Sequence, residues 1–352
     1  MNTVNPVSTP AQPQVNGQTA LWVGILFSVL FTGLIWLVRP LLPTVNFLPD
    51  TGAAWYYWQL PDPTFWTRAT AWIGYALHQI GMWGLIYYAQ KQRPNYTGNL
   101  HRFNILALGF NALFIGLHVL QTAIWYDGLA QDVSIFSSQG SVVLMLVLIL
   151  LMENQRRGLF FGRKLNLLKE AGRVVRQYHG YIFAWAIIYT FWYHPMENTL
   201  GHLLGVLYTF LLMLQGSLIF TRAHLNRWWT VTLELAVLAH GTIVSLQTNT
   251  MWPMFFFGFA ALFIVTQMYG LGLSRVWRWG FILAYIAGAA VVYSSRGWGN
   301  LNEIVRIPVI EYALVFIIAL LIWLGLRLVA GVTWATRRLR PTGPQPLEQS
   351  QA

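Results

Sequence analysis

The stretch that decides the fold covers residues 134–176. It begins with SIFSSQGSVVLMLVLILLM (134–152) and runs directly into ENQRRGLFFGRKLNLLKEAGRVVR (153–176). At about 1.5 Å per residue, the first part is long enough to cross about 30 Å of bilayer hydrocarbon as a helix. The second part carries seven Lys and Arg residues. An apolar run that ends in a basic loop is typical of a membrane-spanning helix whose loop lies in the cytoplasm.

The rest of the chain repeats this alternation of apolar runs and short polar loops. Its 352 residues are 56% hydrophobic and only 9% charged, whereas soluble domains carry about 25% charged residues. We count ten apolar spans of membrane-crossing length, and each must be helical because lipid offers no partner for open backbone groups. The spans cover residues 21–43, 67–89, 102–126, 134–152, 177–193, 196–221, 228–248, 252–273, 277–294 and 308–334.

These spans predict an all-α fold, a polytopic integral membrane helical bundle over residues 21–335. Residues 1–20 precede the bundle, and their Pro, Gln, Asn and Thr content predicts a disordered cytoplasmic tail. Residues 336–352 are predicted to be a second cytoplasmic tail, basic at first and then disordered. The N-terminal tail contains no Lys or Arg and the first apolar run is long, so we do not expect a cleaved signal peptide.

The Lys and Arg residues fall mainly on one side of the ten-span arrangement. They lie in the loops 90–102 and 153–176, in the turns after spans six and eight, and after span ten. The positive-inside rule therefore places both termini in the cytoplasm of a multi-pass protein of the plasma (inner) membrane. Because this topology accounts for the net charge of +11, the charge does not indicate nucleic-acid binding.

The basic segment 153–176 is predicted to form an amphipathic helix on the membrane surface. Its Arg and Lys residues would meet anionic lipid headgroups while its apolar side chains lie on lipid. Those apolar side chains are Leu159, Phe160, Leu165, Leu167 and Leu168.

The absence of cysteine narrows the chemistry. A chain without cysteine has no disulfide, thiolate nucleophile, iron–sulfur cluster or Cys-ligated zinc. Histidine and carboxylate side chains are left as metal ligands. The sequence also has no Walker loop, HExxH motif, nucleotide fingerprint or Gly-x-Ser-x-Gly elbow. The candidate functional residues are therefore the polar residues of the spans.

Four histidines on four different spans fall at a common depth. His78, His118, His202 and His240 each lie about 11–17 Å below the outer end of their span at the helical rise of 1.5 Å per residue. Ionisable residues inside a membrane are costly, so they are candidates for a functional site. The layer lies in the outer half of the membrane, but the sequence does not say whether its members meet.

Such a layer could bind a b-type haem or a non-haem metal. Two facing histidines with small residues nearby are the usual axial ligands of haem b in a helical bundle, which suggests His202 with His240, or His78 with His118. Three or four histidines together could bind iron or copper. Glu197, Glu303 and Glu311 could add carboxylates. His179 and His224 offer a second, inner haem site.

Residues 193–202, YHPMENTLGH, join spans five and six. Pro195 suits the first turn of a helix, and Glu197 lies where the helix dipole favours a carboxylate. His194 and Glu197, together with Glu234 of span seven, are our candidates for catalytic residues.

The leading prediction is a membrane redox or metal-binding protein with a histidine-lined site in the outer half of the membrane. Three other classes stay open. One is a proton-coupled transporter that uses Glu234, Glu311 and Asn111. The others are a histidine-dependent membrane enzyme acting on lipid or acyl substrates, and a non-catalytic subunit that binds other membrane proteins. The sequence does not decide whether the protein is an enzyme.

Overall fold

The structure is a computed structural model that describes residues 15–42, 45–47, 58–92, 94–247 and 251–338. Within these ranges it contains ten α-helices, joined in part by short 3₁₀ turns, and no strand. The helices are α1 (Gly17–Val38), α2 (Phe65–Gln92), α3 (Arg102–Trp125), α4 (Ile135–Arg157), α5 (Lys169–Tyr193), α6 (Leu200–Ser217), α7 (Arg227–Gln247), α8 (Trp252–Val265), α9 (Arg275–Arg296) and α10 (Glu303–Arg338).

Each of the ten predicted spans overlaps one of these helices. Eight segments are long and apolar enough to cross a membrane, and they contain every described α-helix except α2 and α5. Those two helices have 28 and 25 residues, so their length does not exclude them. Their polar and aromatic residues make them less apolar than the eight segments. The protein is therefore all-helical with eight candidate membrane-spanning helices in the described part of the chain.

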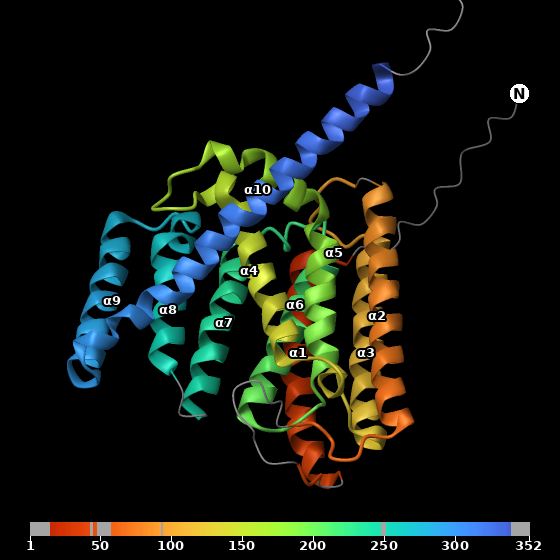
Figure 1. The fold of residues 1–352 in the computed structure, drawn as a ribbon. Coiled ribbons are helices and arrows are strands. Elements are labelled where there is room, and N and C mark those ends of the chain that lie inside the picture. Colours follow the sequence, from red (N-terminus) through yellow and green to blue (C-terminus); the bar gives the residue numbers. More distant parts are fainter. Residues whose placement is uncertain (1–14, 43–44, 48–57, 93, 248–250, 339–352) are drawn as a thin grey trace, which may run out of the picture.

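The helices stand side by side, with α5 in the middle of the bundle (Figure 1). α5 packs against α4, α2, α6 and α10, so partner helices cover much of its surface. α10 crosses obliquely over α8, α4 and α5 (Figure 1). With 36 residues, it is about 54 Å long at the usual helical rise, which exceeds the thickness of a bilayer core and fits its tilt.

One end of the bundle carries the α4–α5, α6–α7 and α8–α9 connections. We call it the basic end because Arg and Lys residues gather in these connections and in the helix turns next to them. The other end carries the α5–α6, α7–α8 and α9–α10 connections. We call it the opposite end.

The predicted surface helix over residues 153–176 is wrong. Helix α4 continues to Arg157, an irregular segment follows, and α5 begins at Lys169. Gly158 and Gly162 have φ angles of +78° and +81°, which side chains with a Cβ rarely adopt, so the helix cannot continue through them.

The apolar residues of this segment do not lie together on lipid. Leu159 and Leu168 are fully buried, and Phe160 and Leu165 pack against the same core cluster. Leu167 alone of the five is exposed. The segment therefore covers the basic end of the bundle, and most of its apolar side chains belong to the core.

Candidate functional site

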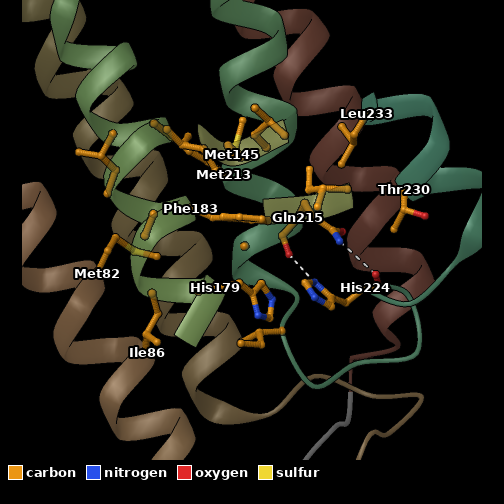
Figure 2. A pocket seen from close by; sticks show the side chains of 18 of the residues that line it. Met82, Ile86, Met145, His179, Phe183, Met213, Gln215, His224, Thr230 and Leu233 are labelled. Atoms are coloured by element: carbon orange, nitrogen blue, oxygen red, sulfur yellow. Dashed lines mark hydrogen bonds between the residues drawn. The ribbon is translucent and has the colours of Figure 1, made fainter. Parts of the chain in front are cut away.

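A large cavity lies between α2, α4, α5, α6 and α7. Its volume is about 130 Å³. Most of its wall is apolar and includes Met82, Met145, Met213 and Phe183. Figure 2 shows these side chains on several helices around one space. The space between these helices is therefore mainly apolar.

Two histidines supply polar groups at the end of this cavity that lies toward the basic end. His179 belongs to α5, and His224 lies in the connection between α6 and α7. Figure 2 shows both rings at the same end of the cavity. They are close enough for His179 to influence the charge of His224.

The hydrogen bonds of these two rings fix their tautomers. The Nδ1 atom of His179 lies 2.8 Å from the carbonyl oxygen of Arg176. The Nδ1 atom of His224 lies 2.8 Å from the carbonyl oxygen of Gln215. A carbonyl only accepts, so each Nδ1 carries the hydrogen, and Nε2 of a neutral ring keeps its lone pair. Neither Nε2 has a hydrogen-bond partner among the described residues.

His224 is neutral near pH 7. Burial lowers its pKa to about 4, and the neighbouring His179 lowers it further, while the hydrogen bond to Gln215 opposes the shift. The Nε2 atom is therefore an acceptor for a hydrogen bond, or a ligand for a metal, over the physiological pH range.

Most other polar groups of the cavity wall already hold partners. Gln215 donates to the carbonyl of His224 at 3.0 Å and accepts from the indole of Trp229 at 2.7 Å. Glu234 is bound by Arg157, and Glu153 by Arg156. The Tyr208 hydroxyl, two helical turns from Gln215, makes no hydrogen bond within the described residues. The two Nε2 atoms thus form the polar centre at the basic end of the cavity.

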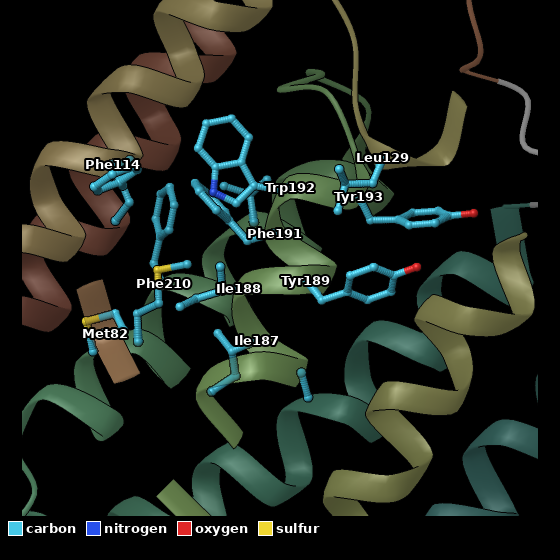
Figure 3. Close-up of a cluster of buried hydrophobic side chains, with 14 of the residues drawn as sticks. Met82, Phe114, Leu129, Ile187, Ile188, Tyr189, Phe191, Trp192, Tyr193 and Phe210 are labelled. Atoms are coloured by element: carbon cyan, nitrogen blue, oxygen red, sulfur yellow. The ribbon is translucent and has the colours of Figure 1, made fainter. Parts of the chain in front are cut away.

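His78 and His118 both contact Trp192, which belongs to the aromatic core shown in Figure 3. The Trp192 indole donates to Nδ1 of His78 at 3.2 Å, so Nε2 of His78 donates to Oδ1 of Asn111 at 2.8 Å. Nε2 of His118 donates to the carbonyl of His194 at 2.8 Å, and Nδ1 faces the Gln121 amide at 3.1 Å. Both nitrogens of each ring have partners, which leaves no lone pair for a metal.

The remaining histidines of the predicted layer gather near the opposite end. The rings of His194 and His202 have centroids 5.4 Å apart, and Nε2 of His240 lies 3.2 Å from the carbonyl of Gly201. Burial holds the pKa of His194 well below its usual value, and the neighbouring histidines lower it further. Nε2 of His202 is buried and has no partner within the described ranges.

The histidines of the predicted layer lie in a row and do not surround one centre. His78 and His118 both contact Trp192, His118 also donates to the carbonyl of His194, and His202 lies beside His194. Across the described part of the chain, no three His, Asp or Glu side chains form a group able to hold a metal ion.

The carboxylates named as catalytic candidates are both held by arginine. Oε1 of Glu197 lies 2.9 Å from Nη2 of Arg39. Arg157 binds both oxygens of Glu234, at 2.9 and 2.8 Å. Glu197 lies at the opposite end and Glu234 nearer the basic end, so these residues do not form one site. Sequence reasoning assigned Arg157 to the charged loop, and only its place one residue before Gly158 hinted that it ends a helix.

No protein-family model matches the chain, and comparison with curated proteins and with solved structures gave no match.

Proposed function

We propose that the protein is a multi-pass membrane protein that binds a lipid-soluble molecule in the cavity between α2, α4, α5, α6 and α7. In this proposal all ten helices cross the plasma membrane, and the basic end with both termini faces the cytoplasm, as the positive-inside rule predicts. Anionic lipid headgroups then lie beside the basic residues of 153–176. The observation that carries the proposal is the pair of partnerless Nε2 atoms in an apolar cavity.

The hydrogen bonds of the two histidines define the head of the ligand. Because Nδ1 of His179 and of His224 donates to a carbonyl, Nε2 can only accept. Beside the two histidines, at the basic end of the cavity, the ligand must therefore present hydroxyl or N–H groups. A hydroquinone meets this need and a quinone, which has only acceptor oxygens, does not. The expectation of a redox protein thus becomes the binding of a lipophilic carrier in its reduced form.

The apolar wall defines the tail of the ligand. Four methionines line the cavity, and their unbranched, polarisable side chains adapt to irregular apolar partners. An alkyl or isoprenoid chain that enters from the bilayer leaves one apolar environment for another, so packing against this wall, and not transfer out of water, decides its affinity.

The test compares the affinities of decylhydroquinone and decylquinone for the purified protein in nanodiscs without oxygen. Tryptophan fluorescence measures the binding of each molecule. We expect the hydroquinone to bind about 5- to 150-fold more tightly, since one unmade hydrogen bond costs about 1–3 kcal/mol. His179→Phe and His224→Phe should abolish this preference.

Gly216→Phe is the matched control variant. Gly216 lines the cavity, and a Cβ there would meet no atom within 4 Å, so a phenyl ring can enter the space. This variant should weaken both molecules alike. Equal affinity for the two molecules in the wild-type protein would refute the proposed hydrogen bonds from the ligand to the two histidines. Unchanged binding in Gly216→Phe would refute the cavity as the binding site.

A haem or metal site at the opposite end is a second candidate, and the buried, partnerless Nε2 of His202 favours it. His240 is the proposed second ligand. Protein expressed with added haem should then show a Soret absorption band that His202→Ala and His240→Ala both remove. Metal analysis tests iron or copper. A wild-type protein without band or metal would end this candidate.

A further inference from the structure

Glu311 is a buried carboxyl group without a partner. It lies on α10 with 2% of its surface exposed. Its Oε2 atom is buried and makes no hydrogen bond. Neither oxygen has a hydrogen bond or ion pair with any described residue.

The surroundings of Glu311 are apolar. Ile307, Glu311, Val315 and Ala319 are spaced four residues apart and form one stripe of α10. Ile307 lies against Gly258 of α8, and Val315 and Ala319 belong to a core cluster with residues of α4 and α8. Glu311 therefore lies between two residues that face α8 and the core.

The other buried glutamates of the described chain differ from Glu311 in one respect. Each of them is bound by an arginine. The pairs are Glu197 with Arg39, Glu234 with Arg157, and Glu303 with Arg296. Along α10, Glu311 is about 12 Å from Glu303 at the usual helical rise, so the Arg296 pair does not serve it.

Few titratable groups lie near Glu311. Helix α8 contains none, and the charged residues of α4, Glu153, Arg156 and Arg157, lie at its basic end. On α5 the titratable groups are tyrosines and His179, besides Lys169, Glu170, Arg173 and Arg176 toward the basic end. On α10 itself Tyr312 shares a hydrogen bond with Thr266 at 2.7 Å, and Arg306 binds the side chain of Asn302. Arg157 is near enough to act on Tyr312, but its guanidinium is bound by Glu234. No described cation is placed to stabilise an ionised Glu311.

An ionised, unpaired carboxylate in such a place is costly, whereas the protonated form is tolerated. We propose that Glu311 is a proton-binding site within the membrane domain and that it holds its proton near pH 7. The site goes beyond ligand binding in the cavity, because Glu311 does not line it. Glu311 can lose its proton when a cation or a hydrogen-bond donor comes close to it on α10, because either one stabilises the carboxylate.

Infrared spectroscopy of the full chain in lipid tests the proposal directly. A protonated carboxyl group has a carbonyl stretch that carboxylates and amides lack. The difference between wild type and Glu311→Gln near pH 7 should contain this band, because glutamine keeps the size and neutrality of the protonated side chain. Glu234→Gln is the control and should remove no such band, since Arg157 binds both oxygens of Glu234.

A hydrophobic carbodiimide, which reacts with protonated carboxyl groups in membranes, provides a second measurement. Mass spectrometry should find the adduct on Glu311 and not on Glu234, with less adduct as the pH rises. If wild type and Glu311→Gln have the same infrared band, or if only the carboxylate form of Glu311 is present near pH 7, the proposal is wrong.

Discussion

Removal of the Glu234 charge is the sharpest test of the packing at the basic end. The guanidinium of Arg157 has no exposed side-chain surface and binds both Glu234 oxygens. Glu234→Gln keeps the shape of the side chain but leaves Arg157 as a buried charge without a counter-charge. Loss of one partner of a buried ion pair costs about 3–5 kcal/mol. We expect the free energy of unfolding to fall by about this amount.

Glu303→Gln is the matched control. Arg296 also binds both oxygens of Glu303, at 2.9 and 3.0 Å, but 35% of the Arg296 side chain is exposed. Water can solvate that guanidinium after the change, so the expected cost is about 1 kcal/mol or less. The two variants therefore separate the effect of burying the arginine from the effect of hydrogen-bond geometry on the free energy of unfolding.

Unfolding in mixed micelles, followed by the fluorescence of the 18 tryptophans, measures both variants. Arg157→Met combined with Glu234→Leu should recover most of the lost stability, because an apolar pair needs no desolvated charge. The reasoning is refuted if Glu234→Gln costs no more than Glu303→Gln.

Two further predictions use the same unfolding assay. A Cβ at Gly74 would lie 2.2 Å from Cη2 of the buried Trp192, so Gly74→Ala should cost about 1–3 kcal/mol. Gly84→Ala on the same helix, with no atom within 4 Å, should gain up to about 1 kcal/mol, and equal effects would contradict this packing. The pKa of His224 is about 4 in the folded protein and about 6.5 in an unfolded chain, so its contribution to stability is present above pH 6.5 and is lost as the pH falls toward 4. His224→Gln should lose less stability than wild type between these pH values, and an unchanged pH profile would show that His224 does not titrate as described.

The sequence predicted the helices well because the requirement for them is local. A run such as 134–152 must be helical in lipid whatever its neighbours are, and α4 covers nearly all of it. The prediction failed in 153–176, where hydrophobicity suggested a surface helix. The two glycines with positive φ break that helix, and tertiary packing then buries Leu159 and Leu168.

The candidate site was predictable only in part. Helical rise gives the depth of a histidine from the sequence, so His78 and His118 were correctly expected on two different helices. Rotation of each helix about its axis is set by its partners, and it decides that both rings support Trp192. The sequence also named His179 and His224 as a pair, but nothing in it indicated the cavity between them.

The amino-acid sequence by itself thus determined the all-helical fold, the apolar segments and the concentration of basic residues at one end of the bundle. These are properties of single segments and of the lipid that surrounds them. Tertiary structure decided which ionisable groups are satisfied: Glu234 has Arg157, whereas Glu311 has no partner and two histidine Nε2 atoms face a cavity. The physical reason is that hydrogen bonds and ion pairs act over a few ångströms, between side chains that only helix packing brings together.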